Sequence, residues 1–247
     1  MKTIEFKNPT YVGDPINAVK IFNEKESDEL VVLDIDATVN GVEPDYRKIA
    51  NLAAECRMPL CYGGGVRRPD QAEKLIGLGV EKVAISAAAI EDFSLVTRTA
   101  EAVGRQSVVV VLDIHRRSGP FRKGYELTTH NGKRTVKLDP FEAARRMVDA
   151  GAGEIVVNSV DRDGRMSGYD LELARRMREE VNIPLTMLGG AGSLRDIESL
   201  FRECGVVGAA AGSLFVFKGK YRAVLINYPN RAEKDQIWTA AAALPTS

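Results

Sequence analysis

The sequence of 247 residues has no long hydrophobic run and no excess of charge of either sign. No apolar stretch approaches the roughly 20 residues that a helix needs to cross a bilayer, and the N-terminus lacks the apolar centre of a secretory signal. Lys and Arg together number 34, as do Asp and Glu, so no basic surplus indicates a nucleic-acid partner. We therefore expect a cytoplasmic protein that binds neither membranes nor nucleic acids.

Side chains that bind metals are scarce as well. The three cysteines and two histidines have no spacing typical of a metal site, and no serine or cysteine stands in a hydrolase-type nucleophile turn. The cysteines are Cys56, Cys61 and Cys204, scattered as reduced buried thiols usually are. The sequence thus predicts no metal ion and no cofactor. We interpret His115 and His130 as polar loop residues, although His115, two residues beyond Asp113, is also a candidate for a substrate contact.

What the chain does contain is one half-sequence in two copies. The apolar run that follows Glu29 recurs 125 residues later behind Glu154, and Pro59, which leads into a glycine-rich stretch, recurs at Pro184. Repetition over this length indicates two blocks built alike, each several βα units long. A glycine-rich turn in each block favours a substrate held by a phosphate at either end.

Short apolar runs alternate with helical patterns along the chain. The expected strands are residues 30–33, 60–62, 83–85, 108–112, 155–157, 185–188 and 207–210. The expected helices are residues 15–25, 45–56, 69–78, 93–103, 140–150, 171–181, 194–204 and a last one from Phe217. Continuously apolar strands are typical of a parallel sheet covered on both faces. The pattern predicts an α/β fold, a (β/α)8 TIM barrel in a single domain over 1–247, with half-barrel repeats at about 13–125 and 138–225.

The pattern is one strand short at its start. Seven strands are visible where eight close a barrel, and only residues 3–6 precede the first helix with a strand-like pattern. Either that piece closes the barrel or, as we favour, the first strand is missing from this chain. Residues 115–137 and 161–169 are too long and polar for simple turns and are therefore more often functional. Within the first of them, residues 125–129 alternate like a hairpin strand.

The two glycine-rich turns carry a phosphate-binding signal. Residues 63–65 and 189–192 each stand between an expected strand and an expected helix, where backbone N–H groups can meet an anion. Tight turns need glycine for backbone reasons alone, but two turns in register within a duplicated frame favour phosphate binding. We call these two expected phosphate-binding sites the first and the second cradle. Ser86 and Ala87 are expected to complete the first cradle, and Gly212 and Ser213 the second.

Five carboxylates stand at or just after the expected C-terminal ends of strands, the face where barrel enzymes build their active sites. They are Asp34, Asp36, Asp113, Asp161 and Asp163. Carboxylates gathered at one mouth are candidates for general acid–base catalysis, because mutual repulsion and burial raise a pKa toward the working pH. Each can instead cap a helix or anchor a loop. That alternative is weakest for Asp113, which ends a long strand directly before the long polar loop.

Three charged residues mark the opposite ends of the strands. Glu29, Lys82 and Glu154 stand at equivalent positions, at the N-terminal ends of three different strands. They form either a solvated rim or a charged ring around the barrel axis.

These strings resemble the cyclase subunit of imidazole glycerol phosphate synthase, the HisF family, from about Gly13 to Phe217. The motifs are Gly13-Asp-Pro, Asp28-Glu-Leu-Val-Val-Leu-Asp34, Tyr62-Gly-Gly-Gly65, Gly151-Ala-Gly-Glu-Ile155, Asp161-Arg-Asp-Gly164, Ser167-Gly-Tyr-Asp170 and Gly189-Gly-Ala-Gly192. A related sugar-isomerase family shares the duplication, but the last two motifs are closer to the cyclase. The resemblance implies a barrel lyase with a bis-phosphate substrate across its mouth. It also implies a HisH-type glutaminase that docks on the opposite face and sends ammonia through the barrel.

The resemblance assigns roles by matching position. Asp113 corresponds to a catalytic aspartate, and Asp34 and Asp163 correspond to active-site carboxylates. The first phosphate site would comprise Gly64, Gly65, Ser86 and Ala87, and the second Gly164, Gly190, Gly212 and Ser213. Glu29, Lys82 and Glu154 match three of the four charged residues that gate the entry of ammonia.

The chain also departs from the family. The missing first strand would carry a second catalytic aspartate and the gate's arginine, and Ser86 and Ala87 stand where the family has an asparagine and a threonine. Residues 7–23 and 218–229 are similar instead to a branch found with bacterial surface-polysaccharide genes. That branch is implicated in making acetamidino groups on nucleotide-linked sugars. Its first strand runs into Val-Lys-Thr, which Met1-Lys-Thr matches, so we expect an internal start codon here.

We therefore interpret the chain as a HisF-type subunit of a glutamine-dependent amidotransferase that acts on a nucleotide-linked surface sugar. One alternative is the histidine-pathway cyclase, which makes imidazole glycerol phosphate and AICAR. The other is a scaffold that docks the glutaminase and conducts ammonia without catalysis.

Overall fold

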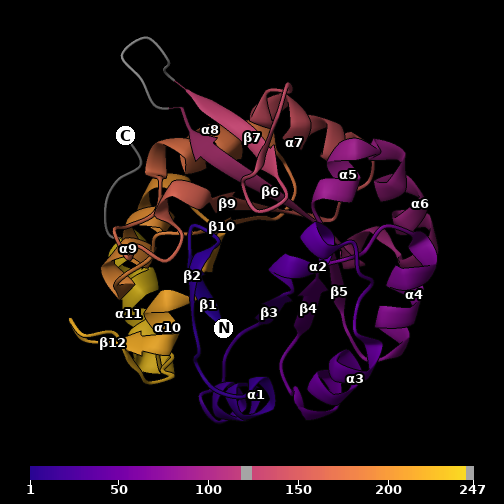
Figure 1. Ribbon diagram of the computed structural model, residues 1–247. Helices are drawn as coiled ribbons and strands as arrows, with labels where there is room; N and C mark the ends of the chain where they lie inside the picture. The colour runs from indigo at the N-terminus through magenta and orange to yellow at the C-terminus, as the bar shows by residue number, and fades with distance from the viewer. Residues whose placement is uncertain (118–123, 243–247) are drawn as a thin grey trace.

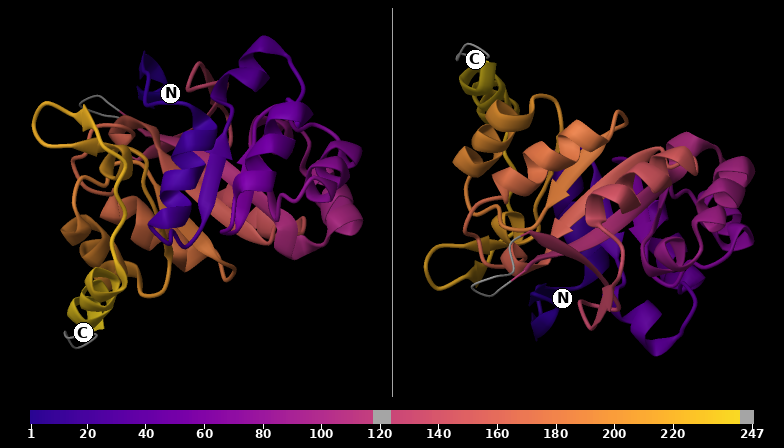
Figure 2. Two further views of the ribbon diagram at one scale, coloured as in Figure 1. Left: turned by 90° about the horizontal axis from the view of Figure 1, so that it is seen from below. Right: turned by 90° about the horizontal axis from the view of Figure 1, so that it is seen from above.

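The computed structural model describes residues 1–117 and 124–242, and Figure 1 shows the ring of strands and helices that they form. Seven parallel strands make one curved sheet in the order β11-β10-β9-β6-β5-β4-β3, so parallel strands that follow one another in the chain are neighbours. The main helices lie outside this sheet (Figures 1 and 2). This arrangement confirms the α/β fold of the TIM-barrel type.

The parallel strands are β3 (Leu30–Leu33), β4 (Leu60–Gly63), β5 (Lys82–Ile85), β6 (Val108–Arg116), β9 (Glu154–Ser159), β10 (Leu185–Leu188) and β11 (Gly208–Ala210). The main helices are α1 (Pro15–Glu24), α3 (Tyr46–Glu55), α4 (Pro69–Gly77), α6 (Phe93–Val103), α7 (Pro140–Asp149), α8 (Leu171–Glu180), α9 (Leu194–Cys204) and α11 (Arg231–Ala242). Shorter helices follow three strands, namely α2 (Ile35–Asn40), α5 (Ala87–Glu91) and α10 (Ser213–Val216).

Local sequence sets the starts of several helices. Asp14 caps α1 by accepting hydrogen bonds from the N–H groups of Ile16 and Asn17 at 3.0 and 3.2 Å, and Asp139 caps α7 in the same way. A proline follows each cap at the first helical position, where its fixed φ suits the helix and its missing N–H costs nothing. Both helices therefore begin at the prolines that the sequence pattern indicated.

The hydrophobic core has two layers. Side chains on the outer face of the sheet, such as Val83, Val110 and Ile155, are fully buried against the helices. Each such burial stabilises the fold by about 1.5–3 kcal/mol. The smaller layer inside the barrel consists of Cys61, Ala84, Val109, Val111 and Val156. The barrel interior is thus lined by small apolar groups.

The strand β3 differs from the expectation of burial on both faces. Val31 and Leu33 are 39% and 36% exposed, although Leu30 and Val32 pack against the outer core. The reason is that β3 is an edge strand: within the described residues, nothing pairs with the outer edges of β3 and β11. Its inward-facing side chains therefore lack a neighbouring strand on one side.

The residues before α1 do not close the barrel. Strand β1 (Lys2–Ile4) pairs antiparallel with β2 (Lys7–Thr10), and this hairpin lies over the barrel mouth rather than beside β3 (Figure 1). The alternative in which residues 3–6 supply the eighth strand is therefore wrong. At the other end of the opening, the Asp28 carboxylate is joined to Tyr228 and Lys234 at 2.8 and 2.7 Å.

The expected helix from Phe217 is also wrong. Strands β12 (Phe217–Lys218) and β13 (Ala223–Val224) form a hairpin there, and helix begins again only with α11. Gly219 has a φ of +71°, a left-handed turn that ends any helix. Helix α11 packs on α9, where Trp238 stacks on Phe201 with ring centroids 4.4 Å apart. No described helix is long and apolar enough to span a membrane.

The long polar segment after β6 contains the expected hairpin strand. Strand β6 extends beyond the sheet to Arg116 and pairs antiparallel with β7 (Tyr125–Thr129), which pairs with β8 (Arg134–Val136). Residues 118–123 of this segment lie outside the described residues. The turn between β7 and β8, residues 130–133, reaches over the barrel mouth, where it borders the cavity described next.

Candidate functional site

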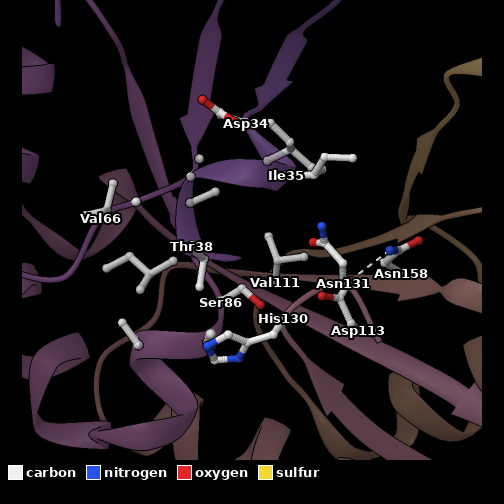
Figure 3. A pocket seen from close by; sticks show the side chains of 18 of the residues that line it. Asp34, Ile35, Thr38, Val66, Ser86, Val111, Asp113, His130, Asn131 and Asn158 are labelled. Carbon is white, nitrogen blue, oxygen red and sulfur yellow. Dashed lines mark hydrogen bonds between the residues drawn. The ribbon is translucent and has the colours of Figure 1, made fainter. Parts of the chain in front are cut away.

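A cavity of about 90 Å³ opens at the mouth formed by the C-terminal ends of the parallel strands (Figure 3). Six residues expected in the first half of the site line it together, although they come from four different strands. They are Asp34, Gly64, Gly65, Ser86, Ala87 and Asp113. The structure thus brings the first expected phosphate cradle and the expected catalytic aspartate into one space.

The Gly64 turn needs glycine for two reasons. Its φ is +123°, in the region that side chains with a Cβ rarely adopt, and an added Cβ would overlap the carbonyl oxygen of Asp34. The following Gly65 also has a positive φ of +74°. The close approach of the two chain segments leaves this turn at the cavity wall, where its backbone is available to a ligand.

Asp113 is a buried carboxyl group at the end of β6, and its side chain turns into the cavity. Burial raises its pKa from 3.8 to about 6, and the charge of Asp163 adds to this shift. The Nδ2 group of Asn158 donates a hydrogen bond to Asp113 Oδ1 at 2.8 Å, which acts in the opposite direction (Figure 3). Asp113 can therefore exchange a proton near neutral pH, as general acid–base catalysis requires.

The other expected carboxylates are engaged in local contacts. Asp34 lines the cavity on the side away from Asp113 (Figure 3). It also caps α2, because its carboxylate accepts hydrogen bonds from two backbone N–H groups of the next turn at 3.2 Å. Asp163 forms an ion pair with Lys2 at 2.8 Å. Asp161 anchors the loop, since it accepts the backbone N–H of Arg116 and binds His115 Nδ1 at 2.8 Å.

The second expected cradle lies at the same mouth, after β9, β10 and β11. Its residues are Gly164, Gly190, Gly212 and Ser213. Arg222 joins two of them, donating hydrogen bonds to the carbonyl oxygen of Gly164 at 2.9 Å and to Ser213 Oγ at 3.5 Å. The Lys2 side chain packs on the third, because a Cβ at Gly212 would meet its Cε at 2.7 Å. Gly190 has a φ of +108° and lies against the Gly168 carbonyl.

Three cationic or ionisable side chains at this mouth have no motif in the local sequence that would identify them. Lys2 comes from the N-terminal hairpin, Arg222 from the β12–β13 turn and His130 from the β7–β8 turn. His130 lines the cavity, whereas His115, which we interpreted as a polar loop residue with a substrate contact as the alternative, is paired with Asp161. Only a three-dimensional structure brings these segments to one place, since none of the three carries a motif.

The opposite end of the barrel holds the three charged residues that were expected to form either a rim or a ring. Lys82 Nζ lies 3.0 Å from Glu29 and 2.9 Å from Glu154, and the Thr186 hydroxyl donates to Glu154 at 2.6 Å. Burial disfavours the charged form of Lys82, but its hydrogen bonds to Glu154 and Glu29 outweigh burial and raise its pKa. The three side chains are thus joined in one ion-paired cluster, and a charged ring around the barrel axis stays a prediction.

Within residues 1–117 and 124–242, no three His, Cys, Asp or Glu side chains gather as metal ligands would. The residues at the mouth therefore offer acid–base and anion-binding groups: one carboxyl group that titrates near neutrality, two glycine-lined turns and cations beside the second turn.

Comparison with known proteins gives consistent matches over nearly the whole chain. Residues 1–222 match the family described as histidine biosynthesis protein. A relative from Leptospira interrogans, provisionally named imidazole glycerol phosphate synthase subunit HisF, is 50% identical over 238 residues, 96% of this chain and 93% of the relative. A relative from Vibrio vulnificus, provisionally named subunit hisF3 of that synthase, is 53% identical over 234 residues, 95% of this chain and 89% of the relative.

A more distant relative carries the same name without qualification. The imidazole glycerol phosphate synthase subunit HisF of Saccharolobus solfataricus is 36% identical over 215 residues, 87% of this chain and 84% of that protein. Fold, mouth and sequence matches agree, and the chain belongs to the histidine biosynthesis protein family as a HisF-type member.

Proposed function

We propose that this chain is the ammonia-using subunit of a glutamine-dependent amidotransferase and works with a HisH-type glutaminase. Its substrate is a bis-phosphate or nucleotide-sugar molecule that lies across the barrel mouth between the two glycine cradles. The observation that carries the proposal is Asp113, a buried carboxyl group with a pKa of about 6 in the same cavity as the first cradle. Its position supports acid–base catalysis on a substrate held at that mouth.

The two cradles would anchor the ends of the substrate and leave its centre near Asp113. The N–H groups around Gly64 and Gly190 are suited to phosphate oxygens because such turns expose several donors at once. Ammonia forms a C–N bond to an electrophilic carbon and gives up a proton to Asp113. Asp113 then returns a proton to the oxygen that leaves as the C–O bond breaks. Asp34 and Asp163 are proposed to orient the polar groups of the substrate on either side.

The route for ammonia would run from the charged ring to the mouth. Lys82, Glu29 and Glu154 stand at the entrance, and the small apolar groups of the interior, such as Ala84 and Val109, follow. Neutral ammonia crosses an apolar passage at a far lower cost than ammonium, because a buried charge loses its hydration. The glutaminase is therefore proposed to dock at the ring.

Within this family, we propose that the reaction is the acetamidino modification of a nucleotide-linked surface sugar. The resemblance of residues 7–23 and 218–229 to the surface-polysaccharide branch supports this reading. The alternative is the histidine-pathway cyclase reaction, which the names of the relatives favour. A scaffold without catalysis is less well supported. It would not require the Asp113 carboxyl group, whose burial in the mouth costs free energy.

The decisive experiment supplies the chain with its glutaminase, glutamine and one of two substrates. We expect amidine formation with a nucleotide-linked acetamido sugar, its amidotransferase and a nucleoside triphosphate that activates the amide oxygen as a leaving group, and little turnover of the histidine-pathway bis-phosphate. The control is Asp113→Asn, which keeps the shape of the side chain and removes the acid. Robust turnover of the histidine-pathway substrate, abolished in that variant, would establish the alternative instead. If the wild type turns over neither substrate, the result would support the non-catalytic scaffold instead.

A further inference from the structure

The two cradles differ in the positive charge beside them. Lys2 and Arg222 both contact the second cradle. The first cradle has no such neighbour, since neither lysine nor arginine is among the described residues that line its cavity. Two carboxylates do line it, Asp34 and Asp113. A phosphate bound there would face two negative charges, which repel it strongly in a partly buried site.

His130 is the remaining ionisable residue of that cavity. It stands on the turn between β7 and β8 and extends its ring into the cavity on the side of Ser86 (Figure 3). Its Nδ1 atom lies 3.1 Å from the hydroxyl of Thr129, which is itself only 4% exposed. This contact fixes the ring and engages one of its nitrogen atoms, so Nε2 is the atom left to meet a ligand.

The backbone of this turn holds His130 in an uncommon conformation. His130, Asn131 and Gly132 have φ values of +54°, +59° and +74°, so three successive residues are left-handed. For residues with a Cβ this conformation costs free energy and is maintained only by its surroundings. Both His130 and Asn131 of this turn border the cavity.

We propose that His130 is the cationic residue of the first phosphate cradle. Its imidazolium donates the Nε2 hydrogen to a terminal phosphate oxygen, while the Gly64–Gly65 turn and the Ser86 hydroxyl donate to the other oxygens. The proposal rests on the proposed function and adds a binding residue to it. The ligand class is a phosphomonoester dianion, whose charge the imidazolium offsets in place of a lysine or arginine.

The charges around this cavity make the assignment testable. The other ionisable groups that line it are Asp34 and Asp113. A neutral residue in place of His130 would therefore leave a bound dianion facing carboxyl groups without a cation.

The test uses inorganic sulfate, which is a tetrahedral dianion near neutral pH. Amide ¹H–¹⁵N chemical shifts of Gly64 and Ala87 report binding at the first cradle, and those of Gly212 and Ser213 report the second. At a pH of about 6, we expect His130→Gln to weaken sulfate binding at the first cradle about tenfold, the loss of one charge-assisted hydrogen bond. Binding at the second cradle should be unchanged, which also shows that the variant is folded.

A second variant completes the test. His130→Lys keeps a cationic donor at this position and should retain sulfate binding at the first cradle, whereas His130→Gln should not. Equal affinities of the wild type and His130→Gln at the first cradle would overturn the assignment of His130 and leave the bis-phosphate proposal intact. Failure of sulfate to shift either set of amides would overturn the bis-phosphate proposal itself, and the role of His130 with it.

Discussion

At the level of single residues, Asp113 has two opposing properties. It is buried enough to raise its pKa to about 6, and the charged form is therefore costly in the folded protein. The same burial prepares it for proton transfer near neutral pH. Asn158 moderates the cost through its 2.8 Å hydrogen bond to the carboxylate. Stability and proposed activity thus depend on the same carboxyl group in opposite ways.

Replacing Asp113 by asparagine should stabilise the protein at neutral and higher pH while abolishing turnover. Because the pKa of the folded state is raised from 3.8 to about 6, the stabilisation from the bound proton is complete below 3.8 and lost as the pH rises through 6. Asparagine carries no charge, so the variant avoids a cost of up to about 3 kcal/mol above that range. Thermal melts on either side of pH 6 measure the difference.

The matched control for that experiment is Asp149→Asn, which changes an exposed carboxylate at the end of α7. We expect no comparable gain there. Turnover should fall about 10²–10⁴-fold in Asp113→Asn, as is typical for the loss of a proton-transfer group. A variant with unchanged turnover would remove Asp113 from the mechanism.

Replacing Asn158 by leucine should raise the pKa of Asp113 above 6. The amide of Asn158 donates to the carboxylate and lowers its pKa, and a leucine of similar size cannot do so. The ¹³C chemical shift of the Asp113 carboxyl carbon, followed through a pH titration, gives the value directly. Asn51→Leu, at an exposed asparagine of α3, serves as the control and should leave the titration unchanged. The same midpoint in both variants would contradict this account of Asp113.

At the level of elements, the mouth is assembled from two kinds of segment. The C-terminal ends of the parallel strands supply the carboxylates and the glycine turns. Antiparallel hairpins, β1–β2, β7–β8 and β12–β13, supply Lys2, His130 and Arg222. The division has a physical basis, because parallel strands all end at the same place, whereas a hairpin tip can reach across the mouth from its edge.

Gly64→Ala tests whether the first glycine turn requires its special backbone. The substitution adds a Cβ at a residue whose φ is +123° and places it against the backbone of Asp34. These backbone atoms cannot move aside without straining the chain. We expect a loss of about 2 kcal/mol or more in the free energy of unfolding, together with weaker sulfate binding at the first cradle. Denaturant titration gives the first quantity and amide shifts the second.

Gly77→Ala is the control, because Gly77 ends α4, has no positive φ and has open space where the Cβ would stand. A helix favours alanine over glycine by roughly 0.5–1 kcal/mol, so this variant should be as stable as the wild type or more so. Equal losses in both variants would mean that the Gly64 turn has no special requirement.

At the level of the whole molecule, the barrel separates two ends for which we propose different roles. The ion-paired cluster lies at the N-terminal ends of β5 and β9, and the mouth lies at the C-terminal ends of the same strands. Small apolar side chains occupy the interior between them. One parallel sheet thus sets both the spacing and the direction of the proposed ammonia route.

Lys82→Met should reduce glutamine-dependent turnover more than ammonium-dependent turnover. Removal of the amine leaves Glu29 and Glu154 facing each other without a cation, which disturbs the proposed docking face and entrance but not the mouth. The ratio of the two rates, measured with the glutaminase present, is the informative quantity. Lys48→Met, at an exposed lysine of α3, should leave the ratio unchanged. An equal fall in both rates would place Lys82 outside the ammonia route.

The sequence by itself determined the parallel strands, most of the helices, both glycine turns and Asp113. These features follow from local rules: apolar runs of strand length, aspartate–proline helix starts and glycines between strand and helix. Periodic patterns also indicated that the C-terminal strand ends would meet, because parallel strands share one direction. The position of the site at the mouth was therefore predictable before any contact was known.

Only the tertiary structure decided the β12–β13 hairpin, the exposed inner face of β3 and the cations of the mouth. Lys2 reaches Asp163 across 161 residues of sequence, and Arg222 reaches Gly164 across 58. A charged side chain has no periodic signature, and its partner is fixed by where distant segments pack. His130 shows the same limit, since its place in the cavity depends on a hairpin that bends over strand ends contributed by the other half of the chain.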